Sequence, residues 1–436
     1  MRKLLFILTF GIAFHCASGG EPDAPAGQDT LTGTWDGLRP RLAKSGVTFS
    51  GGYIGEVIGN TTSGLRTGAE YAALLQFGAE FDAEKLIHWP DATLHIAAIY
   101  PHGGSVAAKY SGDLGNVSNV EAYDSLRLYE AWLEQKLLHN HVALRVGFMA
   151  ADSEFAVTDS STPFINSDFG APAAMTLNFP ISSYPYSALG IRLRIEPTDT
   201  CYLQVAAYDG NPAPGTNADP TPGAAASNEY NKHGTQFALR GDEGAMFFAE
   251  IGWHTPKPAC GEKNAPLASS LKLGATYHTD SFADIRDTTL GLPHPRSHHG
   301  DTAIYFIAER EIWREPGTAA DGLTAFLRTV FAPADRNFSN ASAETGLAYR
   351  GIFQSDARDT LALGLAWLEV SPRVAAAQRT IGTRTQDYEA VIELTYQRAL
   401  TPWCSIQPDI QYILHPGGST AHDNALVIGL RTTIIF

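Results

Sequence analysis

The residues of this sequence best suited to chemistry are arginines and carboxylates that occupy every second position of short apolar runs. Arg145, for example, stands between Leu144 and Val146. The residues that we expect to line a pore in this way are Arg145, Arg192, Arg194, Glu250, Glu393, Asp409 and Arg431. A guanidinium offers a rigid fork of donors and a carboxylate offers acceptors, so together they can hold a polar solute. A charged face with few lysines favours the wet lining of a pore over the outer surface of a soluble sheet.

No catalytic motif accompanies these residues. The nucleophile elbow, the zincin helix, the Walker A loop and the dinucleotide-binding fingerprint are all absent. Glu309 and Glu311 project to one face of a strand, but nothing sets them on either side of a sugar at the separation a glycosidase needs. His294, His298 and His299 fall in a Pro- and Gly-rich segment, which indicates a solvated loop more than a metal site. We predict no enzyme, no metal and no cofactor.

The elements that must position these residues are strands, and the clearest is the last. Read back from Phe436, every second residue is apolar except for one threonine, and the alternate face carries Arg431. The run is long enough to cross a bilayer as a tilted strand of about 9–11 residues. A chain that ends on an aromatic residue in such a strand is typical of an outer-membrane β-barrel. An edge strand of a soluble sandwich is the alternative.

Composition and the first residues agree with an exported β-protein. The chain has 436 residues, of which 44% are hydrophobic and only 18% charged. Residues 1–20 read as a signal peptide, with Arg2 and Lys3 before an apolar run and small residues after it. Residues 21–46 read as a linker with a short helix or turn, and 47–436 as the barrel. A formal charge of −15 gives no footprint for nucleic acid. Cys201, Cys260 and Cys404 remain after the leader, and whether two of them form a disulfide stays open.

The number of strands follows from parity. A first pass yields about seventeen alternating runs, whereas a bacterial barrel needs an even number with long outer loops and short periplasmic turns. Counting from both ends agrees only if residues 236–240 belong to a long outer segment, 210–244. The prediction is therefore an all-β fold, a transmembrane barrel of sixteen antiparallel strands, which is wide enough for a water-filled channel. The other expected outer segments are 58–70, 101–124, 150–186, 279–301, 332–342, 371–387 and 415–423.

Several segments resemble the OprB family of carbohydrate-selective outer-membrane porins. They are Trp35-Asp36-Gly37-Leu38-Arg39 with Gly46-Val47-Thr48-Phe49, Gly68-Ala69-Glu70-Tyr71, residues 112–122, residues 126–135, and Val146-Gly147-Phe148 leading to Asp152-Ser153-Glu154-Phe155. The resemblance implies an outer-membrane porin that passes small sugars by passive diffusion. The expected partners are small sugars, outer-membrane lipid and, through Phe436, the barrel-assembly machinery, and a homo-oligomer is left open.

Within the segment 126–135 the residues Arg127, Tyr129, Glu130, Trp132 and Glu134 make a strand that is polar for contact with lipid. Its charged residues need partners in the lumen or elsewhere. A structural set of salt bridges and a role in binding the solute are equally good interpretations.

The outer segment 150–186 is expected to fold inward and narrow the channel. Its candidate residues are Asp152, Glu154, Phe155, Asp168, Phe169, Tyr184 and Tyr186. Arg145, Arg192 and Arg194 lie on the two strands that this segment connects, so they either form the constriction with its aromatic residues or only hold the segment by salt bridges. Two other functions stay open: a porin for other small polar solutes such as arginine-type amino acids, and a secreted soluble β-protein.

Overall fold

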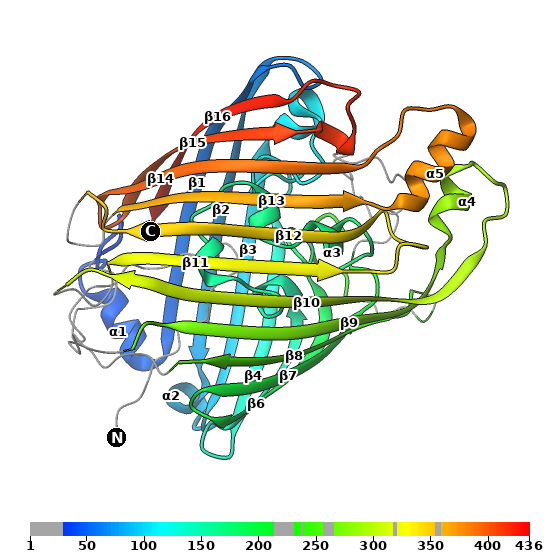
Figure 1. Ribbon diagram of the computed structural model, residues 1–436. Coiled ribbons are helices and arrows are strands. Elements are labelled where there is room, and N and C mark those ends of the chain that lie inside the picture. The colour runs from blue at the N-terminus through cyan, green and yellow to red at the C-terminus, as the bar shows by residue number, and fades with distance from the viewer. Residues whose placement is uncertain are drawn as a thin grey trace.

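The described part of the chain forms a single closed barrel of sixteen antiparallel strands (Figure 1). The computed structural model describes residues 29–212, 231–237, 239, 241, 243–255, 266–316, 321–353 and 359–436. Each strand pairs with its neighbours in the sequence, and β1 pairs with β16 to close the barrel. The predicted fold and the number of strands are confirmed. Gln236 and Phe237 lie outside any strand, so the run that was assigned to an outer segment to make the number of strands even is indeed not a strand.

The strands are long and the helices short. The strands are β1 Val47–Thr62, β2 Gly68–Asp82, β3 Ala92–Gly103, β4 Arg127–Leu137, β5 Val142–Met149, β6 Ala188–Thr198, β7 Cys201–Asp209, β8 Ala245–His254, β9 Ser269–Ala283, β10 Ser297–Arg314, β11 Gly322–Phe331, β12 Ser339–Arg350, β13 Asp359–Val370, β14 Tyr388–Thr401, β15 Cys404–Leu414 and β16 Ala425–Ile435. The α-helices are α1 Leu38–Ser45, α2 Ala83–Ile87, α3 Ala173–Thr176, α4 Ile285–Thr289 and α5 Pro372–Ile381. None of the helices in the described ranges is long and apolar enough to span a membrane.

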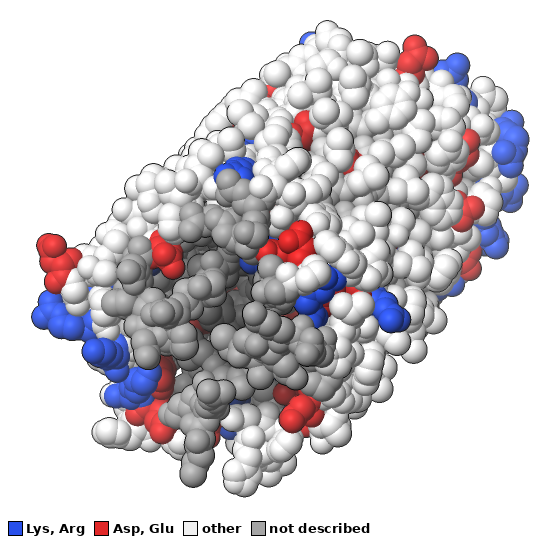
Figure 2. Space-filling view, turned by 60° about the vertical axis from the view of Figure 1, so that its left-hand side comes forward, with Lys and Arg blue, Asp and Glu red and all other residues white. Residues whose placement is uncertain are grey.

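Longer connections gather at one end of the barrel, here called the loop end, and the shorter ones at the other, the turn end. Loops 1 to 8 are residues 63–67, 104–126, 150–187, 210–244, 284–296, 332–338, 371–387 and 415–424. In Figure 1 the turn end, with α1 and the C-terminus, is on the left, and α4 and α5 are on the right. The broad outer wall carries few charges, which gather mainly toward the two ends (Figure 2).

The period-two pattern sorts side chains between the two faces of the wall. On β8, Ile251 and Trp253 are exposed on the outside, whereas Glu250, which precedes Ile251, is buried inside. On β16, Leu430 is exposed and Arg431 is buried. A strand in a barrel turns alternate side chains to the lipid and to the lumen, and this explains how charged residues alternate with apolar ones in the sequence.

Several predicted loops were too long. The expected outer segment 279–301 shrinks to 284–296, and 332–342 shrinks to 332–338. His298 and His299 therefore lie in β10, which is 18 residues long, and the prediction that they belong to a solvated loop was wrong. The backbone ladder continues beyond the apolar stretch with polar side chains, so hydrophobic alternation marks where a strand leaves the lipid rather than where it ends.

An apolar core lies inside the barrel, between loop 3 and the wall. The rings of Phe164 and Phe169 stack with centroids 4.2 Å apart and meet Phe326 of β11. Gly364 of β13 lets them approach, because a Cβ atom there would lie 2.7 Å from carbons of both loop rings. The interior is thus packed and not an empty tube.

The N-terminal segment closes the barrel seam at the turn end. Arg39 of α1 is buried and donates hydrogen bonds to the carbonyl oxygen of Phe49 (3.0 Å) and to the C-terminal Phe436 (2.8 Å). The backbone N–H of Leu31 donates to the carbonyl oxygen of Ile435 (2.8 Å). Helix α1 ends at Gly46, whose φ of 101° is readily adopted by glycine. One guanidinium therefore joins α1, β1 and the end of the chain.

Several sequence expectations fall wholly or partly outside the described residues. They are the signal peptide at residues 1–20, residues 21–28 of the linker, part of the outer segment 210–244, and Cys260. Cys201 and Cys404 are free thiols.

Replacing Arg39 with alanine should weaken the seam. The change removes charge-assisted hydrogen bonds, each worth roughly 1.5–3 kcal/mol. We expect the folded band to convert to the unfolded band at a lower temperature in a heat-modifiability gel. The control is Arg41→Ala, because Arg41 is exposed on the same helix. Equal conversion temperatures for the two variants would contradict a role for Arg39 at the seam.

Candidate functional site

Loop 3 crosses the lumen from one side of the barrel to the other. It leaves β5 and returns to β6, yet its backbone N–H groups at Ile165 and Asn166 bond to Glu393 of β14 (2.5 and 3.0 Å). Gln407 of β15 donates to the carbonyl oxygen of Pro163 (2.6 Å). In a ring of sixteen strands, β14 lies nearly opposite β5. The loop can reach it only through the interior, as the sequence led us to expect.

Carboxylates on the wall accept hydrogen bonds from the backbone of this loop. Each comes from a different strand, and they meet the loop in sequence order. The bonds run from Ala150 to Glu130 of β4 (3.1 Å), from Ala156 to Glu250 of β8 (3.1 Å), from Ser160 to Glu309 of β10 (2.7 Å), and from Ile165 and Asn166 to Glu393 of β14. Buried backbone N–H groups need acceptors, and water is excluded where the loop lies against the wall. These glutamates supply the acceptors.

Donors on the wall satisfy the carbonyl oxygens of the same loop. Arg328 of β11 is fully buried and donates to the carbonyl oxygens of Asp168 and Gly170 (both 2.6 Å), while its Nε bonds to Glu344 of β12 (2.9 Å). Lys272 of β9 donates to the carbonyl oxygen of Val157 (2.7 Å). Arginine suits this task because one side chain carries five N–H groups in a fixed geometry.

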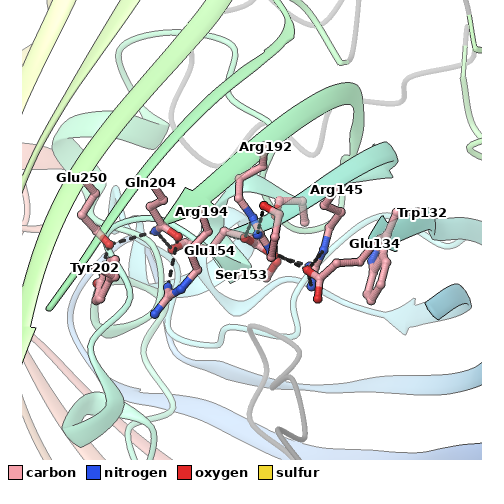
Figure 3. Close-up of polar contacts among 12 residues, drawn as sticks. Trp132, Glu134, Arg145, Ser153, Glu154, Arg192, Arg194, Tyr202, Gln204 and Glu250 are labelled. Atoms are coloured by element: carbon pink, nitrogen blue, oxygen red, sulfur yellow. Dashed lines mark hydrogen bonds and ion pairs between the residues drawn. The ribbon is translucent and has the colours of Figure 1, made fainter. Parts of the chain in front are cut away.

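Four charged side chains form a closed ion-pair lattice where loop 3 begins (Figure 3). Arg192 Nη2 lies 2.8 Å from Glu134 Oε2, and Arg192 Nε lies 2.6 Å from Glu154 Oε2. Arg145 Nη2 lies 2.8 Å from Glu134 Oε2, and Arg145 also bonds to Glu154. The four side chains are 2–6% exposed, so each charge is neutralised inside the lattice. Glu154 belongs to loop 3, and the lattice therefore ties the loop to β4, β5 and β6.

Aromatic rings lie over one arginine of this lattice and over the neighbouring Arg194. The guanidinium of Arg145 lies 3.7 Å from the ring centroid of Trp132, which stacks on His95 at 4.7 Å. Arg194 lies 3.9 Å over the ring of Tyr202. Unlike the lattice arginines, Arg194 is 28% exposed, so part of its guanidinium remains accessible. Gln204 links the two regions, because it accepts from Arg194 and donates to Glu250 (2.9 Å).

Loop 2 covers the opposite arc of the wall. Its Leu114 N–H bonds to Glu389 of β14 (2.8 Å), and Gln411 of β15 donates to the carbonyl oxygen of Val117 (2.8 Å). Arg431 of β16 reaches Asn119 (2.8 Å) and also pairs with Glu56 of β1 (2.7 Å). The backbone N–H of Asn119 donates to Ile165 (2.8 Å), so loops 2 and 3 meet inside the barrel.

Arg127, at the start of β4, differs from the other arginines of the inner wall. Arg145, Arg192, Arg328 and Arg431 each have a carboxylate partner, whereas Arg127 has none within the described residues. It is 1% exposed, and its Nε and Nη2 atoms have no hydrogen-bond partner there. Four tyrosines of β4, loop 2 and loop 3 lie around it: Tyr123, Tyr129, Tyr184 and Tyr186.

These tyrosines present both ring faces and hydroxyl groups. Arg127 lies 4.9 Å from the ring centroid of Tyr186 and donates to the hydroxyl of Tyr123. The rings of Tyr123 and Tyr186 stack at 5.8 Å, and both are partly exposed. The hydroxyl of Tyr184 donates to the carbonyl oxygen of Val120 in loop 2 (2.8 Å). The cluster therefore lies where loops 2 and 3 approach each other.

Two loop carboxyl groups titrate near neutrality. Burial raises the pKa of Asp152 to about 7, against the opposing hydrogen bond from the backbone of Tyr184. Burial, aided by the nearby carboxylate of Glu344, raises the pKa of Asp168 to about 7. Both groups lie in loop 3, so the charge of the loop changes with pH.

The structure divides the predicted site residues into separate groups. Arg145, Arg192 and Glu154 come together with Glu134, and Arg194 is linked to Glu250 through Gln204. Tyr184 and Tyr186 lie by Arg127 and Tyr129 instead. Glu393 and Asp409 share the far wall, and Arg431 lies at the seam. Phe155 and Phe169 are buried in packed clusters. Direct contact of any of these residues with a solute stays a prediction.

Sequence reasoning missed much of the support for the loops. Glu309, Arg328, Gln407 and Gln411 were not among the predicted site residues, although each lies on the polar face of its strand. The whole of loop 2 was overlooked as a lining element. Alternation could have found the four wall residues, but no local pattern shows which loop they meet.

Comparisons with known proteins agree with this architecture. The family model described as "Carbohydrate-selective porin, OprB family" matches residues 66–436. Porin B of Pseudomonas aeruginosa is 25% identical, with 98% of this chain and 95% of the relative covered. A putative porin, QuiX, of Acinetobacter baylyi is also 25% identical, with 93% of each chain covered. The high-pH structure of Pseudomonas putida OprB superposes with a TM-score of 0.83 at 24% identity, covering 94% of this chain and 98% of that one.

Removing one arginine of the lattice should loosen loop 3. Arg192→Ala leaves Glu134 and Glu154 with one arginine between them, and breaking a buried pair typically costs about 3–5 kcal/mol. We expect larger and noisier single-channel conductance in planar bilayers. The control is Arg194→Ala, on the same strand but more exposed. Unchanged conductance in Arg192→Ala would show that the lattice does not hold the loop.

Conditions that ionise Asp152 should also loosen loop 3. Because the pKa of Asp152 in the folded protein lies above its ordinary value of 3.8, its contribution to stability is complete below about pH 4 and is lost as pH rises through about 7. We expect faster hydrogen exchange of loop 3 amides at pH 8 than at pH 5.5, after correction for the intrinsic rate. Asp152→Asn should reduce this difference, and an undiminished difference in that variant would assign it to other groups.

Proposed function

The chain belongs to the OprB family of carbohydrate-selective porins, and on that premise we propose that it passes small neutral sugars by diffusion through a constriction between loops 2 and 3. As a member of this family it is an outer-membrane porin for carbohydrates. Beyond membership of the family, we propose that the solute is small and uncharged and that particular residues of the channel contact it. A channel of this kind needs no catalysis, and we assign none to its residues.

The balance of charge in the lumen carries the proposal. Four arginine–glutamate pairs neutralise each other on the inner wall: Arg145 with Glu134, Arg192 with Glu154, Arg328 with Glu344 and Arg431 with Glu56. Other wall glutamates are occupied by loop N–H groups. Pores that select ions usually carry rings of one charge sign. A paired, polar lining instead suits an uncharged solute with many hydroxyl groups.

The Arg127 cluster is our candidate for direct contact with the sugar. Tyr123 and Tyr186 offer partly exposed ring faces for the C–H surface of a sugar ring, and Arg127 offers donors for its hydroxyl oxygens. Arg127 is buried behind these rings, so a solute reaches it when the tyrosines move apart. The lattice arginines Arg145 and Arg192 act as positioning residues, because their donors are engaged in holding loop 3.

The same observation favours one other solute class. An arginine that has no carboxylate partner among the described residues could pair with a carboxylate brought by the solute, as in a small amino acid. This second candidate differs from the first in one respect: the solute charge would compensate Arg127. Competition between glucose and an amino acid in the same channel separates the two.

The proposed function also implies an orientation of the barrel in the membrane and a set of partners. We assign the loop end to the outside of the cell and the turn end, with Phe436, to the periplasm. Phe436 is then the residue offered to the barrel-assembly machinery, and the exposed outer wall contacts lipid.

Liposome swelling should show faster entry of monosaccharides than of disaccharides. Arg127→Met should slow monosaccharide entry several-fold, because it keeps the length of the side chain and removes the donors. Arg41→Met, on the exposed face of α1, is the matched control. Equal rates for Arg127→Met and the control would remove Arg127 from the contact site. Block by an amino acid but not by glucose would favour the second candidate.

A further inference from the structure

Five exposed arginines gather at the loop end, on loops 5 and 7. They are Arg286, Arg296, Arg373, Arg379 and Arg384. The whole chain has a formal charge of −15, so a positively charged patch is unusual for this protein. Helices α4 and α5, which carry three of the five, project together beyond the strands (Figure 1). Figure 2 shows basic side chains in a row along the corresponding edge of the molecule, with acidic side chains beside them. We call this set the arginine patch.

A buried carboxylate joins the two loops that carry the patch. Asp284 has a fully buried side chain, and its Oδ2 lies 3.0 Å from His298, 3.2 Å from Arg296 and 3.8 Å from Arg373. Arg296 also pairs with Asp287 (2.8 Å). Loops 5 and 7 are therefore held together, which fixes the backbone positions from which the arginines extend. A preorganised set of charges loses less freedom when it binds a partner.

Three arginines of the patch lack a direct ion pair among the described residues. Arg286, Arg379 and Arg384 have no ion pair within the described residues, and Arg384 donates only to the carbonyl oxygen of Thr420 (3.1 Å). Asp284 and Asp287, the acidic residues of loop 5, are already paired with Arg296. An anion bound here would therefore meet free guanidinium groups.

The patch lies above the lipid-facing part of the wall. On β9 the last exposed large apolar residue is Tyr277, and on β10 the first is Ile304. From Tyr277 to the end of β9 at Ala283 is about 20 Å along a strand that rises ~3.3 Å per residue. With a strand tilt of about 40°, the patch stands ~15 Å above the hydrocarbon edge. That height corresponds to headgroup sugars rather than to acyl chains.

We propose that the arginine patch binds the phosphorylated saccharide headgroup of an outer-leaflet glycolipid. Guanidinium groups match phosphate oxygens in paired hydrogen bonds, and several of them on two loops suit a headgroup with more than one phosphate. The exposed side chains of Leu292 and Ile381 add apolar contacts beside the arginines. Such binding anchors loops 5 and 7 to the membrane surface, and it is independent of which solute the channel passes.

The test is native mass spectrometry of the detergent-solubilised full chain with a lipid built on a diphosphorylated glucosamine disaccharide. The variant Arg286→Gln/Arg379→Gln/Arg384→Gln removes three free charges, and Arg41→Gln/Lys44→Gln/Lys85→Gln makes the same charge change at the turn end. We expect the patch variant to bind at least tenfold more weakly, because each removed guanidinium group takes away an attraction for the phosphates. The control variant should bind like the unmodified chain, and high salt should weaken the binding.

Three results would overturn the proposal. Equal affinity of the patch variant and the control would show that the arginines are not the site. Equal binding of the dephosphorylated lipid would remove the phosphates from recognition. Displacement by inorganic phosphate at the concentration of the lipid would indicate a simple anion site. A heat-modifiable folded band and unchanged sugar uptake in the patch variant show that the barrel itself is intact.

Discussion

Two loops fold inside this barrel, and the backbone N–H and C=O groups that they bury there must all find hydrogen-bond partners. The rest of the structure depends on this constraint. Loops 2 and 3 bring N–H and C=O groups into an interior where water is largely displaced, and each unpaired group would cost about 1–3 kcal/mol. The strands supply acceptor side chains for the N–H groups and donor side chains for the carbonyl oxygens. Glutamates accept from the N–H groups of Ala156, Ser160 and Ile165, and Arg328 donates to carbonyl oxygens of the same loop. Most charged residues of the lumen are explained by this requirement.

This constraint separates support from recognition. A residue whose donors and acceptors are all engaged with the loop has little left for a passing solute, as with Arg192 and Arg328. Arg127 is different, because two of its nitrogen atoms have no hydrogen-bond partner in the described residues and tyrosine rings surround it. The charge of a lumen residue is therefore a poor guide to its role, and the state of its hydrogen bonds is a better one.

The sequence predicted the architecture well because the controlling signals are local. Alternation placed Glu250 and Arg431 on the inner face, and the parity of loops and turns removed the run around Phe237. The side-chain partners of these charged residues were harder to predict. The pairing of Arg192 with Glu154 joins residues 38 positions apart through a loop whose path no local pattern describes. The sequence therefore left open whether these arginines hold the loop or meet a solute, and loop 2 was missed because its anchors lie on β14 to β16.

The amino-acid composition of the loops explains why some of them fold into the barrel and others remain outside it. Loop 3 carries Phe164, Ile165 and Phe169, which become buried against the wall, so entering the barrel removes apolar surface from water. Loops 5 and 7 bury fewer apolar side chains, among them Val374 of α5, and carry exposed arginines. Asp284 bonds to residues of these same two loops and of the strand end beside them. No lumen-facing glutamate is needed to hold them. The composition of each loop thus matches the partners available to it, and one barrel combines a packed interior with charged loops outside.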